Sequence, residues 1–157
     1  MSPVKPVRFT HDHPGELVVF LIGMRINKPW RPDLWGPVFT AMPKMLAELA
    51  RDPESGFLGS RLSMTADGPM VVQYWDSQEK LYAYASKPDA EHRPAWTRFN
   101  AMARRSPGAV GIWHETYVVA RADSIYAHMS PVGLAKVTGH VPVGRHRERA
   151  AERLAAS

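Results

Sequence analysis

The alternation of strand-like and helix-like segments is the feature of this sequence that most restricts its fold. Four segments are rich in β-branched and bulky apolar side chains, as strands are, and the segments between them repeat their apolar residues with a helical period. In chain order we predict a strand at 17–26, a helix at about 34–51, strands at 57–65 and 70–75, a broken helix at 77–105 and a strand at 109–120. This order predicts an α+β, ferredoxin-like split βαβ fold, with both helices on one face of an antiparallel four-stranded sheet.

Turn and cap residues set the expected boundaries of these elements. The Asp-Gly pair at 67–68 predicts a tight hairpin between the second and third strands. Asp33, Ser77 and Asp89 each precede a helical pattern, so we expect their side-chain oxygens to cap the helices that follow. Pro88 interrupts the second helical region and separates it into two segments.

The length of 157 residues indicates one domain with a substantial core. We expect residues 1–16 to form an extended N-terminal arm, residues 17–143 the ferredoxin-like domain, and residues 144–157 a basic C-terminal tail. The tail carries four arginines against two glutamates and so contributes +2 to the net charge of +5. The remaining positive charge is dispersed and is not interleaved with aromatic residues, so we expect no nucleic-acid partner.

Several classes of protein are excluded or disfavoured by the composition. The chain has no cysteine, which excludes disulfides and thiolate metal sites. The N-terminal residues lack the apolar core of a signal peptide, and the longest apolar run, Leu17–Ile22, is too short to cross a bilayer. We therefore expect a cytoplasmic protein with no membrane partner.

The last strand predicts association of two copies. Alternation sends its side chains to two faces, and each face carries large apolar groups. One face has Val110, Ile112, His114, Thr116 and Val118, and the other has Trp113, Glu115, Tyr117 and Val119. An open sheet of this kind is covered if two chains pack their free faces together, so we expect a homodimer with a two-fold interface, a dimeric α/β barrel.

His92 is the best candidate for a functional residue. His92, Trp96 and Phe99 are spaced i, i+4 and i+7, so on a helix they share one face. An imidazole titrates near neutral pH, which suits general base catalysis, and its neutral form binds haem iron. The alternatives for His92 are therefore an axial haem ligand, a general base or a structural residue hydrogen-bonded to a carbonyl group.

Three segments resemble a known family. Trp75-Asp76-Ser77, His92-Arg93-Pro94-Ala95-Trp96 and Gly111-Ile112-Trp113-His114-Glu115-Thr116-Tyr117 resemble the fumagillin-pathway polyketide monooxygenase-like family, over roughly Glu16 to Val137. Its wider relatives are the dimeric α/β-barrel proteins, which include antibiotic-biosynthesis monooxygenases, haem-degrading monooxygenases and aldoxime dehydratases. The resemblance implies a small dimeric enzyme of secondary metabolism, whose organic substrate is held between sheet and helices.

The resemblance leaves the cofactor open. Some relatives oxidise activated substrates without a cofactor, whereas others place a helix histidine on haem iron, and His92 stands at a similar place. Pro88 before this histidine, and Tyr84 where haem degraders carry tryptophan, argue against haem degradation. Haem is thus a possible cofactor, with Trp96 and Phe99 beside it, and the alternative is no cofactor. No third ligand with metal spacing accompanies His92, so we expect no other metal.

Further residues are weighed in the same way. His114, beside Trp113 in the last strand, is either catalytic or a structural support. Arg25 and Asn27 end the first strand, where they either bind a substrate oxygen or anchor a loop. Trp96 and Phe99 belong either to the core or to a ligand platform.

The sequence and the resemblance together indicate a monooxygenase-like oxidoreductase that acts on a small aromatic or polyketide-type substrate. His92, as axial haem ligand or general base, is its expected centre, and His114, Asn27 and Arg25 are the other catalytic candidates. The alternatives are a haem-dependent dehydratase of aldoxime type and a non-catalytic dimer that binds haem or a small ligand.

Overall fold

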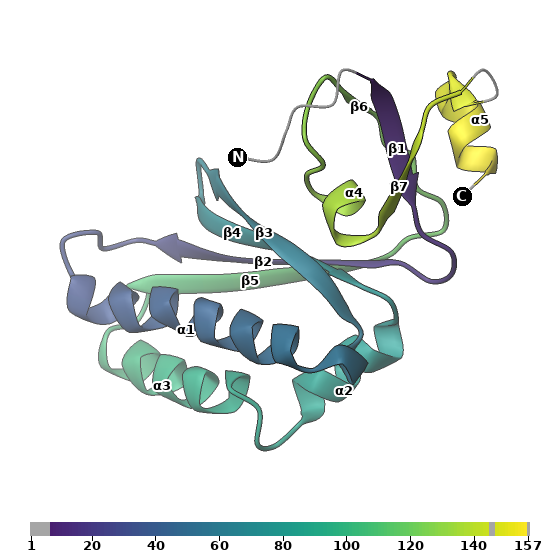
Figure 1. The fold of residues 1–157 in the computed structure, drawn as a ribbon. Coiled ribbons are helices and arrows are strands. Elements are labelled where there is room, and N and C mark those ends of the chain that lie inside the picture. The colour runs from purple at the N-terminus through teal and green to yellow at the C-terminus, as the bar shows by residue number, and fades with distance from the viewer. Residues whose placement is uncertain (1–6, 145–146, 157) are drawn as a thin grey trace.

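The structure, a computed structural model, describes residues 7–144 and 147–156. Its main body is an antiparallel sheet of four strands, covered on one face by three helices (Figure 1). The strands lie in the order β3 (Phe57–Thr65), β4 (Gly68–Trp75), β2 (Val18–Ile26) and β5 (Val110–Val118), and the helices are α1 (Pro32–Arg51), α2 (Gln78–Ser86) and α3 (His92–Arg105). A 3-10 turn, η1 (Pro53–Ser55), joins α1 to β3. The predicted ferredoxin-like α+β fold is confirmed.

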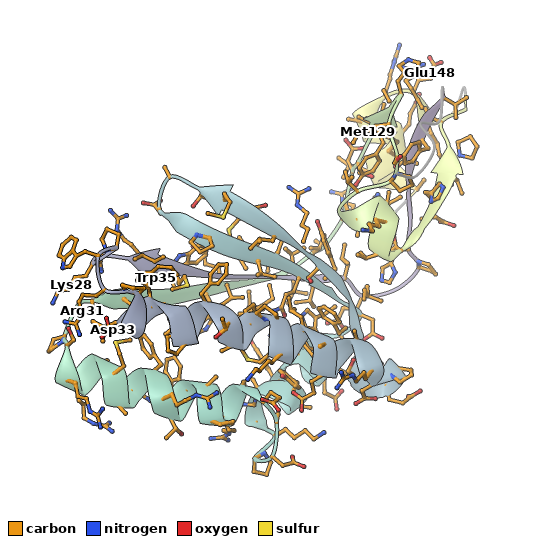
Figure 2. All side chains as sticks on the ribbon, turned by 60° about the vertical axis from the view of Figure 1, so that its left-hand side comes forward. Lys28, Arg31, Asp33, Trp35, Met129 and Glu148 are labelled. Carbon is orange, nitrogen blue, oxygen red and sulfur yellow. The ribbon has the colours of Figure 1, made fainter. Side chains whose placement is uncertain are left out.

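The ends of the helices follow the prediction only in part. Ser77 caps α2 as expected, because its Oγ accepts a hydrogen bond from the Lys80 N–H at 3.2 Å. The prediction that Asp33 is a cap is wrong: α1 already begins at Pro32, and Asp33 lies inside its first turn, paired with Arg31 through Nη2 and Oδ2 at 2.7 Å (Figure 2). Proline is favoured at this first position since it needs no N–H partner there.

The predicted cap at Asp89 is also wrong. The residue that precedes α3 is Glu91, and its side chain makes no capping hydrogen bond. The Glu91 N–H instead donates to the Glu48 carboxylate on α1, with Oε2 at 3.1 Å. A carboxylate from a neighbouring helix thus replaces the local cap.

A second, smaller sheet contains the N-terminal segment that we expected to be an arm. Its order is β6 (Tyr126–Ala127), β1 (Arg8–Asp12) and β7 (Gly139–Pro142), with the short helices α4 (Leu134–Val137) and α5 (Ala150–Ala155) beside it. Figure 2 shows Met129 and Glu148 in this unit, away from α1 and α3. The N-terminal and C-terminal segments therefore meet in one small unit.

The core consists of two clusters at opposite ends of the helix-covered sheet face. Val18, at the start of β2, packs with Leu49, Trp75 and Leu81. Met24, near the end of the same strand, packs with Ala109 and Val110, and α1 and α3 add further side chains. The middle of the sheet face, between the two clusters, is left for a cavity.

Among the helices of the described residues, none is long and apolar enough to span a membrane.

Candidate functional site

A cavity of about 630 Å³ lies between the helix-covered face of the sheet and α1, α2 and α3. This volume is within the range of sites that bind small organic molecules. Most of its lining is aliphatic or aromatic. Besides the indole N–H groups of Trp75 and Trp96, its polar side-chain groups belong to Gln73, Tyr84, Ser86, His92, Arg93 and His114. The cavity is therefore suited to a largely apolar ligand held by few polar contacts.

Strand alternation builds the floor of the cavity. Side chains two residues apart along a strand share a face, and the inward sets are Phe20, Ile22 and Met24 on β2, Val71, Gln73 and Trp75 on β4, and Ile112 and His114 on β5. On the opposite face of the sheet, the Trp113 ring packs over Gly23. A Cβ at Gly23 would lie 2.6 Å from the indole ring. The absence of a side chain at Gly23 lets the strands accept this tryptophan.

Helices α1 and α3 form the roof. Met42 and Met45 of α1 line the cavity, and their flexible thioether chains adapt to ligands of different shape. His92, Trp96 and Phe99 of α3 all line it too, so they share one face of the helix, as their spacing predicted. The Trp96 and Phe99 rings stack with centroids 5.4 Å apart. Trp96 is 52% exposed, so it stands at the rim of the cavity.

His92 has an unusual environment. Both of its ring nitrogens are buried, and within the described part of the chain neither has a hydrogen-bond partner. Its ring lies against Tyr84, with centroids 5.2 Å apart. Whichever tautomer is present, one buried N–H lacks an acceptor, which is unfavourable by about 1–3 kcal/mol. Such a group is uncommon in a native core and points to a role other than stability.

Tyr84 is held by Glu48. The Tyr84 hydroxyl donates to Glu48 Oε2 at 2.8 Å, and the same oxygen receives the Glu91 N–H at the start of α3. Burial, and then the hydrogen bond and charge of Glu48, raise the pKa of Tyr84 well above its ordinary value. Glu48 thus fixes both Tyr84 and the end of α3 that carries His92.

Replacing Tyr84 by phenylalanine should lower the free energy of unfolding at pH 7 by about 1 kcal/mol, the contribution of the lost hydrogen bond. The difference should shrink as the pH rises above about 10, because the unfolded chain then releases the Tyr84 proton while the folded chain, with its raised pKa, still holds it. Urea unfolding of both proteins at neutral and alkaline pH measures this. A difference that stays constant with pH would contradict the role given to Glu48.

His114 lies on the opposite wall of the same cavity. It belongs to β5, pairs with Ile22 across the strands, and its ring packs against Phe20 with centroids 5.6 Å apart. His114 is exposed, whereas the nitrogens of His92 are covered. The structure thus brings both candidate histidines to one cavity.

Gln73 is a cavity residue that sequence reasoning missed. It is only 5% exposed, and its Oε1 accepts the indole N–H of Trp75 at 3.0 Å. Strand alternation could have identified it, because Gln73 is the one polar residue in the alternating set Val71, Gln73 and Trp75 of the strand Met70–Trp75.

Arg25 and Asn27 do not line the cavity. Arg25 is exposed and pairs with Asp67 of the β3–β4 hairpin. The Asn27 side chain donates to the Gly108 carbonyl at 3.0 Å. These contacts correspond to loop anchoring, the alternative that we gave for both residues.

The residues do not fit haem with His92 as axial ligand. An iron ligand directs a nitrogen lone pair at the metal, whereas both nitrogens of His92 are covered by protein in this arrangement of the ring. Arg93 is the only Lys or Arg side chain among the described residues that line the cavity, so the two carboxylates of haem have one cationic partner at most. Within residues 7–144 and 147–156, no group of three His, Asp or Glu side chains is placed to hold a metal ion.

Fold and site define this chain as an α+β ferredoxin-like protein with an apolar small-molecule cavity. A family model described as Monooxygenase af470-like matches residues 17–134, and the chain belongs to this family. It is 27% identical over 147 residues to Monooxygenase af470 of Aspergillus fumigatus, in an alignment that covers 85% of this chain. The chain spans about half the length, 50%, of that relative.

Solved structures share the fold. Aldoxime dehydratase OxdRE, crystallised with butyraldoxime, is similar with a TM-score of 0.54 and 16% identity, over 72% of this chain and 34% of the dehydratase. SnoaB of Streptomyces nogalater, a cofactor-independent oxygenase, is similar with a TM-score of 0.48 and 14% identity, over 69% of this chain and 97% of SnoaB.

Proposed function

We propose that this protein is a monooxygenase-like oxidoreductase that acts on a small aromatic or polyketide-type molecule, with His92 as general base. The observation that carries the proposal is the apolar cavity with a buried, unpartnered imidazole in its wall. Membership of a monooxygenase-like family supports the reaction type. The apolar lining supports an uncharged substrate with several rings.

The reaction needs no external reductant if the substrate is sufficiently activated. A base removes a proton from a CH₂ group activated by a conjugated carbonyl, and the resulting carbanion reacts with oxygen. The CH₂ group becomes C=O and the second oxygen atom leaves as water with the two hydrogens, so the substrate supplies all the electrons. The cavity contributes by orienting the substrate and excluding water from the carbanion.

His92 requires one local change to act as base. Turning the imidazole over about its Cβ–Cγ bond exchanges the positions of ring nitrogens and ring carbons while the ring keeps its outline. Catalytic hydrogen bonds are often incomplete before substrate binds. A ligand atom that forms a hydrogen bond with a ring nitrogen of His92 would give that nitrogen the partner it lacks.

Oxygen uptake tests the proposal. Anthrone is a suitable probe because its CH₂ group is activated by a ketone across the ring. Protein freed of haem and treated with a chelator should consume one O₂ per anthrone and release anthraquinone, faster than buffer does. Uptake that needs added haem would instead favour a haem enzyme, and no uptake beyond buffer under either condition would refute the proposal.

A non-catalytic ligand-binding protein is the second candidate. It is favoured by one observation, namely that both nitrogens of His92 are covered by protein. This candidate predicts that anthraquinone binds while anthrone is not oxidised, and both results come from the same preparation.

We further propose that the protein is a homodimer, as expected from its last strand. The three helices cover one face of the four-stranded sheet, and the other face carries Leu21, Val72 and Trp113, which are only half-buried in the single chain (Figure 1). Helix α4 and the preceding Gly133 lie against the β3 and β4 side of this face, near Gly59, Arg61 and Tyr74, so we expect the partner to cover the side formed by β2 and β5.

A further inference from the structure

The orientation of the Gln73 carboxamide is determined by its neighbour. Indole is a hydrogen-bond donor only, so Gln73 must turn its oxygen to Trp75 Nε1, at 3.0 Å. Trp75 is fully buried and Gln73 nearly so. The amide nitrogen of Gln73 therefore has to point away from Trp75.

That nitrogen is poorly satisfied. Its contact among the described residues is the Met42 sulfur at 4.0 Å, and a thioether is a weak acceptor. The two N–H bonds of the Gln73 amide thus have one weak acceptor between them, at the wall of an apolar cavity. A buried donor in this condition is stabilised by a ligand that brings an oxygen atom.

The position of Gln73 in the floor indicates how such a ligand would lie. Gln73 is opposite Phe20 in the β4–β2 pairing, and the Phe20 ring packs against His114 of β5. Phe20 therefore lies between the amide and an imidazole, and the strands that carry these two groups are about 10 Å apart. A flat fused-ring molecule over Phe20 spans this distance.

We propose that Gln73 is a substrate-binding residue, whose amide N–H binds the carbonyl or phenolic oxygen of a neutral, flat, fused-ring substrate. This inference rests on the proposed function and names its substrate class. When the substrate loses a proton, negative charge develops on that oxygen, and a preorganised N–H stabilises it more than in the ground state. Molecules with several carboxylates are disfavoured, because Arg93 is the one Lys or Arg side chain of the described lining.

A matched pair of probes tests this assignment without turnover. Fluorene and 9-fluorenone have the same tricyclic skeleton, and only fluorenone has an oxygen atom. Dissociation constants are measured by quenching of tryptophan fluorescence. In Gln73→Met the ratio of the fluorenone constant to the fluorene constant should rise roughly two- to tenfold, because fluorenone loses one neutral hydrogen bond. Fluorene affinity should stay the same, and comparing ratios cancels the hydration of each probe.

Two further measurements keep the test decisive. The double variant Gln73→Met with Trp75→Phe removes the indole N–H that Gln73→Met leaves without an acceptor, so it replaces the single variant if that does not fold. In the wild-type protein, the side-chain amide protons of Gln73 should shift downfield in ¹⁵N–¹H spectra with fluorenone and not with fluorene.

An unchanged ratio with unmoved amide resonances would overturn the assignment, as would failure of both probes to bind. Preference for fluorenone through Gln73, in a protein that does not oxidise anthrone, would keep the assignment and reject only the proposed oxygenase reaction.

Discussion

Replacing His92 by leucine should remove turnover and at the same time make the protein more stable. If His92 is the base, the rate should fall by roughly 10²–10⁴-fold. Because neither ring nitrogen has a partner in the described structure, an apolar side chain of similar size removes an unsatisfied polar group. The free energy of unfolding should then rise by about 1 kcal/mol.

Anthrone oxidation and urea unfolding of His92→Leu measure the two effects. His114→Leu is the matched control, since it removes an imidazole from the same cavity at an exposed position. Its free energy of unfolding should stay within about 0.5 kcal/mol of the wild type. If His114→Leu loses turnover while His92→Leu keeps it, His114 is the base. A less stable His92→Leu protein would show that the imidazole is structural.

A fall in turnover together with a rise in the free energy of unfolding is informative, because replacing a structural residue does not give this combination. Replacing a residue that was selected for packing makes the protein less stable. A functional residue, in contrast, is often kept although it lowers the stability of the protein. His92 lines the cavity and packs against Tyr84, which Glu48 holds in place. The fold therefore fixes the surroundings of the imidazole but leaves its own nitrogens without partners.

The sequence predicted the main sheet and its helices because their signals are local. The apolar period of the helices, the Asp67-Gly68 turn of the hairpin and the Ser77 cap are each recognised within a few neighbouring residues. The second sheet escaped prediction since its pairing is distant in sequence: His11 in β1 pairs with His140 in β7, and its Nδ1 contacts the Ser124 hydroxyl at 2.7 Å. No local pattern identifies such partners.

The candidate site was predictable on its helical side and less so on the sheet. Spacing alone placed His92, Trp96 and Phe99 on one face of α3. Arg25 was considered for the site by its position at a strand end, but alternation from the inward Met24 turns Arg25 to the opposite face. The same alternation, applied to β4, would have identified Gln73.

The covered nitrogens of His92 lay beyond any pattern in the sequence. The neighbours of the ring come from other helices: Tyr84 of α2 packs against it, and a carboxylate on α1 accepts the N–H of Glu91 just before it. The lack of a partner for the imidazole depends on tertiary contacts.

Replacing Leu21 by glutamate should convert the proposed dimer into monomers. Leu21 is in the middle of the sheet face that the three helices leave uncovered, opposite Val72 on β4 and Glu115 on β5. A carboxylate here would face Glu115 in its own chain, and like charges directly opposite in a sheet repel each other. In the dimer, the same charge would be buried between the two sheets, which disfavours association by several kcal/mol.

Sedimentation equilibrium of the wild type, Leu21→Glu and Thr65→Glu measures the effect. Thr65, an exposed residue at the end of β3, receives the same charge away from the middle of the face and should leave the dimer intact. A wild-type chain that sediments as a monomer at micromolar concentration would refute the dimer. A Leu21→Glu chain that remains dimeric would place the interface on another surface, and the half-buried Leu21, Val72 and Trp113 would then need a different cover.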